Sequence, residues 1–134
     1  MKEKIWRRIE MAPFAKARPR VTKKGTYMPK KYVANRDGLR ALYLEAGGRL
    51  NQQGMLRVSA QFWFRMPGAS WSEKKREETA GTYCGKKPDL DNLLGAVMDA
   101  LLVDDSKVVE LGVCEKRWGY FDAIYIMIEE IDNG

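Results

Sequence analysis

The chain has 134 residues, 45% of them hydrophobic and 31% charged, which predicts one globular domain over residues 1–134 rather than two domains or a disordered chain. It contains no histidine and only two cysteines, Cys84 and Cys114, so a conventional zinc site within one chain and catalysis by an imidazole are excluded. No run approaches the ~20 apolar residues that span a bilayer, and the polar N-terminus does not resemble a signal sequence, so a cytoplasmic protein with reduced cysteines and no membrane contact is expected.

The net formal charge of +6 is unevenly distributed along the chain. Residues 1–31 contain eleven lysine and arginine residues against two glutamates, a net charge of +9, whereas the remainder carries a net charge of −3. A basic N-terminal third joined to a mildly acidic remainder favours binding to an anionic polymer such as a nucleic acid. The alternative is a solvated basic face that contributes only to solubility.

The first half of the chain predicts two strands, a long loop and a helix. Residues 5–11 have the pattern of a first strand. The segment 16–32 contains two prolines and a glycine that prevent a continuous helix, so an extended loop is expected there. Residues 33–50 carry apolar side chains at helical spacing, and residues 56–66 alternate between two faces, as a half-buried strand does.

The second half predicts one long helix and two further strands. Residues 71–80 form a charged segment with room for one short helix. Apolar residues spaced i, i+3, i+4 and i+7 predict an amphipathic helix over 90–102. Residues 108–118 and 120–129 have the pattern of two strands that form a hairpin around Gly119. The predicted fold is therefore α+β, with a mixed sheet of about four strands and two main helices.

Four carboxylates lie around the predicted 90–102 helix, with Asp89 and Asp91 at its start and Asp104 and Asp105 just after its end. Carboxylate oxygens are the ligands that Mg²⁺ prefers, and a metal-activated water is the simplest hydrolytic route in a chain without histidine. The alternative is structural, since Asp89 can cap the helix and Asp91 can interact favourably with its dipole. The helix would be about 18 Å long, so the two pairs meet only if it ends early or if another subunit supplies one of them.

Basic residues on the loop before the first helix complement these carboxylates. Lysine and arginine bind phosphate oxygens, and the tyrosines among them, Tyr27 and Tyr32, can stack on a base or pack against a sugar. The alternative is a disordered basic loop. Two further lysines directly precede the acidic segment. The candidate DNA-binding residues are Lys16, Arg18, Arg20, Lys23, Lys24, Lys30, Lys31, Lys86 and Lys87.

These motifs resemble those of the RusA family of Holliday junction resolvases. The resemblance rests on Lys-Pro-Asp-Leu-Asp-Asn-Leu-Leu at 87–94, Asp-Asp-Ser-Lys-Val at 104–108 and Lys-Ala-Arg-Pro-Arg at 16–20, in the family's order. It implies a homodimeric endodeoxyribonuclease of bacteria or phages that cuts four-way DNA junctions with Mg²⁺, or with Mn²⁺ in its place. A two-fold dimer suits this reaction because it presents two equivalent sites for two symmetric nicks.

The resemblance also implies a role for each carboxylate. The family's catalytic aspartates correspond to Asp89, Asp91 and Asp105, which would bind the metal and position the attacking water. Asp104 would be an adjacent, supporting metal ligand.

The chain departs from the family pattern at two points. Members commonly carry a lysine four residues after the second aspartate of Asp-Leu-Asp, where this chain has Gly95, and they have a longer connection after Asp99. Lys86, Lys87 and Lys107 are candidates for supplying the missing charge, although none has the same position. These departures motivate an alternative function, a junction-binding protein of the same fold with little or no catalytic activity.

Overall fold

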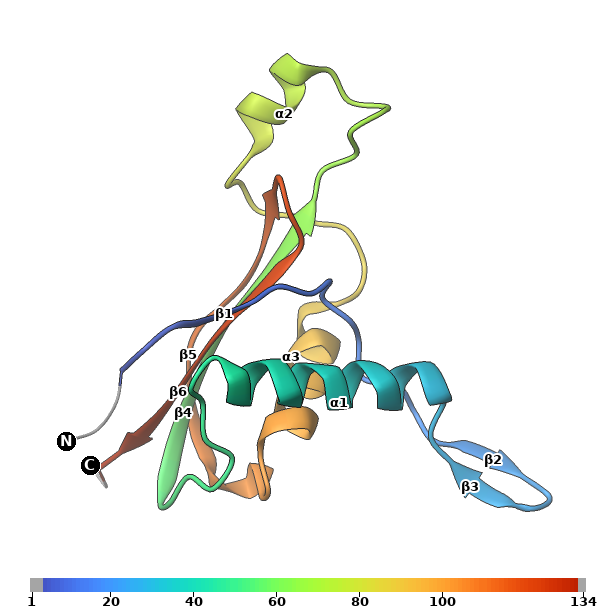
Figure 1. Cartoon of the computed structure of the whole chain (residues 1–134), viewed down its shortest axis with the longest axis vertical. Helices are drawn as coiled ribbons and strands as arrows, with labels where there is room; N and C mark the ends of the chain where they lie inside the picture. The colour runs from blue at the N-terminus through green and yellow to red at the C-terminus, as the bar shows by residue number, and fades with distance from the viewer. Residues whose placement is uncertain (1–3, 133–134) are drawn as a thin grey trace.

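The computed structural model describes residues 4–132 and is built around a mixed four-stranded sheet (Figure 1). The strands are β1 (Arg7–Ile9), β4 (Met55–Arg65), β5 (Val108–Gly119) and β6 (Ala123–Ile131). They lie in the order β1-β6-β4-β5, with β6 antiparallel to both of its neighbours and β5 parallel to β4. The two ends of the chain therefore supply neighbouring strands.

Two helices, α1 (Lys30–Glu45) and α3 (Leu90–Leu101), pack on one face of the sheet and form the core with it. The apolar stripe of α3 turns inward, and Leu93, Val97 and Leu101 are fully buried. Each such side chain stabilises the fold by roughly 1.5–3 kcal/mol relative to an exposed one. The residues of β4 that face the helices are Leu56, Val58, Ala60, Phe62 and Phe64.

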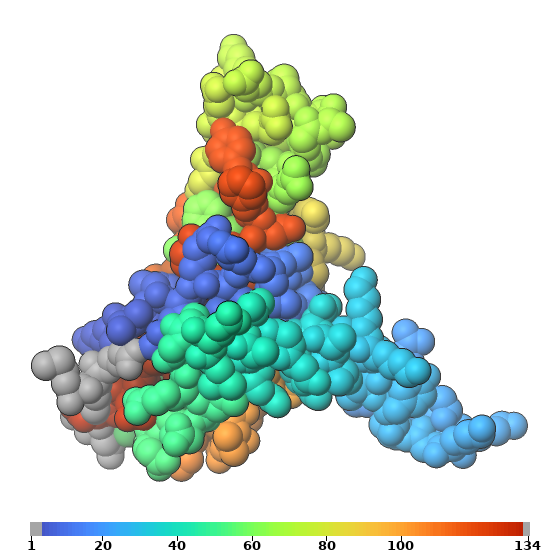
Figure 2. All heavy atoms as spheres, viewed as in Figure 1, coloured from blue at the N-terminus to red at the C-terminus, as the bar shows by residue number. Residues whose placement is uncertain are grey.

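Two small elements stand out from this body. β2 (Arg20–Thr22) and β3 (Gly25–Tyr27) form a separate two-stranded sheet, here called the hairpin arm (residues 20–27). The short helix α2 (Glu73–Thr79) lies at the opposite end of the molecule, and the space-filling view shows both elements projecting from the body (Figure 2). Within residues 4–132, no helix is long and apolar enough to cross a membrane.

The periodicities in the sequence predicted most of these elements correctly. The predicted strand 56–66 is β4, the predicted helix 90–102 is α3, and the charged segment contains α2. The four-stranded mixed sheet with two main helices is confirmed. The strand predicted over 5–11 is shorter, since β1 has only three residues. The helix predicted over 33–50 begins three residues earlier and ends at Glu45.

The prediction of an extended loop over 16–32 was wrong, because this segment contains the hairpin arm and the first turn of α1. Gly25 has φ +126°, which allows the tight turn between β2 and β3. The Thr22 hydroxyl reinforces that turn, donating to the Gly25 carbonyl oxygen at 3.1 Å and accepting the Lys24 N–H at 3.2 Å. Pro29 occupies the N-cap of α1, where its missing N–H costs nothing, so it precedes the helix instead of preventing it.

The predicted hairpin of the last two strands was also wrong, because β4 lies between β5 and β6. The apolar β4 is paired along both edges, and only the connection 120–122 passes its end. Two hydrogen bonds hold this crossing, from Met66 N–H to the Gly119 carbonyl oxygen and from Arg65 N–H to Asp122 Oδ1, both at 2.9 Å. The local sequence pattern predicts where strands occur, but it does not predict which strands pair with one another.

Candidate nucleic-acid interface and active site

The start of α3 presents two exposed carboxylates. Asp89 occupies the N-cap position, and its backbone carbonyl oxygen accepts the N–H of Leu93 at 3.1 Å, but its side chain makes no capping hydrogen bond. Asp91 Oδ1 accepts the backbone N–H of Asn92 at 3.0 Å. Neither carboxylate forms a salt bridge with a residue of the described range 4–132. The structural role considered for the Asp89 side chain is therefore absent, and both carboxylates are open to a cation.

The segment before α3 is hydrogen-bonded to the sheet and so sets the position of Asp89 and Asp91 beside it. Residues 81–86 run along the outer edge of β5, where the Cys84 N–H donates to the Lys116 carbonyl oxygen at 3.0 Å. The N–H of Trp118 donates in return to the Thr82 carbonyl oxygen at 2.9 Å. Cys84 itself is buried in the core. The Asp-Leu-Asp motif therefore begins at a defined point beside β5.

The second acidic pair lies beyond the other end of α3. Asp104 caps the short helix η1 (Asp105–Lys107), and its Oδ1 accepts both the N–H of Ser106 at 3.0 Å and its hydroxyl at 2.6 Å. These two hydrogen bonds hold the pKa of Asp104 below its ordinary value. The Asp105 side chain is exposed and forms no hydrogen bond or ion pair with a residue of the described chain, although its backbone carbonyl oxygen accepts the Val108 N–H. Asp104 thus has a structural task, whereas the Asp105 carboxylate is open.

The two pairs do not converge within one chain. α3 has 12 residues, which places its ends about 18 Å apart. Among residues 4–132, no three acidic or cysteine side chains lie close enough together to hold one metal ion. The pair Asp89 and Asp91 still suits Mg²⁺, because this ion is usually bound by one or two carboxylates together with water and substrate phosphate. A site that also contains Asp105 does not fit a single chain.

Lysines surround the start of α3. The backbone N–H of Lys16 donates to the Asn92 carbonyl oxygen at 2.9 Å, which attaches the basic segment to the first turn of this helix. Lys86 and Lys87 are exposed directly before Asp89. The ammonium group of Lys116 donates to the Lys86 carbonyl oxygen, so a fourth lysine lies near the segment that precedes α3. Its position in the last third of the chain gave no sequence signal, because only the pairing of 81–86 with β5 places it there.

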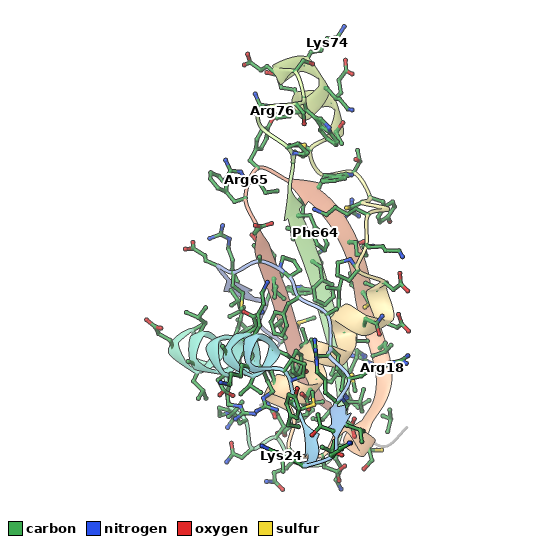
Figure 3. All side chains as sticks on the ribbon, turned by 90° about the vertical axis from the view of Figure 1, so that its right-hand side faces the viewer. Arg18, Lys24, Phe64, Arg65, Lys74 and Arg76 are labelled. Atoms are coloured by element: carbon green, nitrogen blue, oxygen red, sulfur yellow. The ribbon has the colours of Figure 1, made fainter. Side chains whose placement is uncertain are left out.

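The hairpin arm carries further positive charge away from the body. Arg20, Lys23 and Lys24 on the arm are all exposed, as is Arg18 just before it. Figure 3 faces the arm and shows Arg18 and Lys24 in the lower half of the molecule, at the opposite end from Lys74 on α2. The arm gives the basic N-terminal third a shape that can follow a nucleic-acid backbone.

Two more lysines begin α1. Lys30 and Lys31 are exposed in its first turn, which contains no acidic residue. Positive side chains are unfavourable at the positive end of a helix, by ~0.3–1 kcal/mol each. A bound phosphate would offset that cost, because backbone N–H groups and lysines there would both face an anion.

The structure assigns the two tyrosines different roles. Tyr32 is only 4% exposed, packs edge-to-face against Phe14 and donates its hydroxyl to Asp99 Oδ2 at 2.7 Å. Burial, reinforced by this bond, raises the pKa of Tyr32, which therefore stays protonated. The expectation that Tyr32 stacks on a base was wrong, because its ring is enclosed between α1 and α3. Tyr27 on the hairpin arm is 51% exposed and remains able to stack.

Comparison with protein families identifies the chain. The family model for the endodeoxyribonuclease RusA matches residues 10–129, which include the hairpin arm, both acidic pairs, β4, β5 and most of β6, but not β1. A search of curated proteins gave no significant match. The family match spans most of the 134 residues and agrees with the motifs around Asp89 and Asp104. The chain therefore belongs to the RusA endodeoxyribonuclease family.

Proposed function

We propose that this protein is a Mg²⁺-dependent, structure-selective endodeoxyribonuclease that resolves four-way Holliday junctions by paired nicks during recombination and repair. Mn²⁺ can take the place of Mg²⁺, and the enzyme works in the cytoplasm of a bacterium or of a phage-infected cell. The observation that carries the proposal is the pair of open carboxylates, Asp89 and Asp91, among lysines at the start of α3 in a chain of this family.

Asp89 and Asp91 are assigned to hold the metal ion. A divalent ion at such carboxylates lowers the pKa of water and polarises a phosphoryl oxygen, which is the chemistry that a chain without histidine otherwise lacks. The two aspartates also orient the attacking water for the phosphodiester. Asp105 acts with them when it comes from a second copy of the chain, since its own α3 separates it from Asp91. Asp104 supports Asp105 by fixing η1.

The basic residues hold the DNA backbone. Each lysine or arginine that contacts a phosphate makes binding more sensitive to salt, because counterions are released. The exposed Tyr27 adds a stacking surface. The residues assigned to DNA binding are Lys16, Arg18, Arg20, Lys23, Lys24, Lys30, Lys31, Lys86 and Lys87.

The active form is proposed to be a homodimer. Resolution of a junction needs two symmetric nicks, and a two-fold axis supplies two equivalent sites. Within the described chain α3 separates Asp105 from Asp91, and a second copy would bring an Asp105 to the start of α3. Light scattering of the purified protein should give twice the chain mass of 15.4 kDa. A monomer that still makes paired nicks would contradict this assignment.

Cleavage of a labelled four-way junction tests the proposal. With Mg²⁺ the wild-type protein should make paired nicks in the junction and leave a linear duplex of the same sequence intact. Asp91→Asn removes a metal-binding carboxylate but keeps the hydrogen bond to the Asn92 N–H, so nicking should fall by at least about a hundredfold. A junction that stays intact, or nicking by the Asp91→Asn variant at the wild-type rate, would contradict the proposal.

The second candidate is a junction-binding protein of the same fold with little or no catalysis. The separation of the two acidic pairs and the absence of a side chain at Gly95 favour it. It predicts salt-sensitive binding to four-way junctions that Mg²⁺ does not convert into cleavage. The same labelled junction distinguishes the two functions.

A further inference from the structure

The space beside Gly95 is occupied by a lysine from another part of the chain. Gly95 lies four residues after Asp91 on α3, so the two share one face of the helix. A Cβ atom added at Gly95 would lie 3.4 Å from Lys16 Cδ and 3.6 Å from Lys16 Cβ. The aliphatic stem of Lys16 therefore packs directly on Gly95, in the space that a side chain at this position would share.

Lys16 is held there at its backbone as well. Its N–H donates to the Asn92 carbonyl oxygen at 2.9 Å, and Asn92 is three residues before Gly95 on the same helix. Both contacts lie along the part of α3 that carries Asp91. Lys16 is exposed, and within residues 4–132 its ammonium group has no salt bridge. The stem of Lys16 thus lies on this helix face, and its charge is not neutralised by a salt bridge within the described residues.

The other lysines considered from the sequence do not share this position. The ammonium group of Lys86 lies 5.6 Å from the ring centroid of Phe64, on the sheet side. Lys107 belongs to η1, beyond the far end of α3. Lys87 precedes the helix, whereas Lys16 crosses its first two turns.

We propose that Lys16 is the phosphate-binding cation of the active site, placed beside Asp91 because Gly95 has no side chain. The inference rests on the proposed function. Negative charge on the phosphoryl oxygens must be stabilised during phosphodiester cleavage, and a fixed ammonium group at the reacting phosphate provides this. Lys16 binds the phosphate that is cut, while the lysines of the hairpin arm bind phosphates farther along the DNA.

The first test removes the positive charge at position 16 and then introduces a lysine at position 95 of α3. Lys16→Ala keeps the backbone N–H that donates to Asn92, and Lys16→Gln also keeps most of the stem on Gly95. Both should lower the single-turnover cleavage rate by about a hundredfold or more, the usual effect of losing one charge-stabilising group. The double variant Lys16→Ala/Gly95→Lys should regain at least tenfold of that loss. Lys74→Ala, which removes an exposed lysine on α2, is the matched control and should cleave at the wild-type rate.

The second test measures binding without cleavage. In metal-free buffer, the slope of log K against log[salt] for a four-way junction should fall by about 0.9 in Lys16→Ala, as expected for one lost phosphate contact. A junction with a neutral methylphosphonate at the cut position should weaken wild-type binding but not binding by Lys16→Ala. Thermal melting of each variant verifies that the fold is retained.

The outcomes separate the two proposals. If the wild type nicks the junction and Lys16→Ala nicks at the same rate, the role of Lys16 is overturned while the proposed function stands. If the wild type does not nick, the proposed function fails. The salt dependence of junction binding then tests by itself whether Lys16 contacts a phosphate. An unchanged slope in Lys16→Ala and Lys16→Gln overturns the inference in that case.

Discussion

Asp89 shows why a residue must be judged by its contacts and not by its position. It occupies the N-cap of α3, where aspartate is common for structural reasons, yet its carboxylate makes no capping bond. Asp104 occupies the corresponding position before η1 and does cap it, through both hydrogen bonds from Ser106. Two aspartates at the same position relative to a helix thus differ in their contacts: the side chain of Asp89 is open to a ligand, and that of Asp104 stabilises a turn.

The Asp104 carboxylate gives a prediction that NMR titration can check. Because the Ser106 hydroxyl is the largest cause of its lowered pKa, Ser106→Ala should raise that pKa toward the ordinary value of about 3.9. A pKa lowered in the folded state stabilises the protein above the unfolded value, and this contribution disappears as the pH falls through the folded pKa. Wild type and Ser106→Ala should therefore differ in stability at neutral pH and converge in acid. An unchanged Asp104 pKa in the variant contradicts this account.

The Tyr32–Asp99 hydrogen bond links helices α1 and α3. Tyr32→Phe leaves a partly buried carboxylate without its hydroxyl donor, and Arg36 is 3.9 Å away. The free energy of unfolding should fall by roughly 1–3 kcal/mol, measured by urea denaturation. Junction binding below the melting temperature should remain unchanged, because the Tyr32 ring is enclosed. Weaker binding with unchanged stability would instead restore the stacking role expected from the sequence.

At this scale the sequence identified the acidic residues but not their neighbours. Asp89 and Asp91 were found because an amphipathic period marks the start of α3. The contact of Lys16 with Gly95 joins residues 79 positions apart, and no local pattern encodes such a contact. The buried position of Tyr32 depends in the same way on Asp99, which lies 67 positions away.

Among the elements, β4 and α3 were predicted well because burial imposes a period on them. β4 alternates with period 2, and α3 repeats with period 3.6, since each packs one face into a common core. The pairing of β5 was not predicted, because the pattern of a strand does not name its neighbour. Its placement beside β4 brings residues 81–86, and hence the Asp-Leu-Asp motif, to the edge of the sheet.

The pairing of β5 with β4 also sets a requirement at Gly112. The register shifts between Val58 and Ala60, and a Cβ atom at Gly112 would lie 2.2 Å from Ser59 Oγ. Gly112→Ala should therefore destabilise the protein by roughly 1–3 kcal/mol in chemical denaturation, as overpacking does. Ser59→Ala removes the clashing oxygen and leaves contacts of 3.4 Å to Arg57 Cδ and 3.5 Å to the Cβ of residue 59, so the double variant should recover most of the loss. Failure of that recovery would mean that the strain lies in the backbone.

On the scale of the whole molecule, the positive charges of the hairpin arm lie outside the hydrophobic core. The hairpin arm is exposed throughout and lies outside the core cluster. Arg20 and Tyr27 are cross-strand partners, so a two-residue glycine linker can replace residues 20–27. The variant should melt at the wild-type temperature but bind junctions more weakly. Its salt slope should be lower by up to about 0.9 for each of the lost arm cations that contacts phosphate. A large fall in melting temperature would show that the arm stabilises the body.

The sheet order has a consequence for synthesis of the chain on the ribosome. β1 pairs with β6, and β4 pairs with both β5 and β6, so the first described strand finds its partner only after the last described strand has been made. A chain that stops before Ala123 would leave β1 unpaired and one edge of β4 open to other chains. Synthesis of β6 is thus the step that closes the sheet, and products truncated before it should aggregate instead of binding DNA with partial activity.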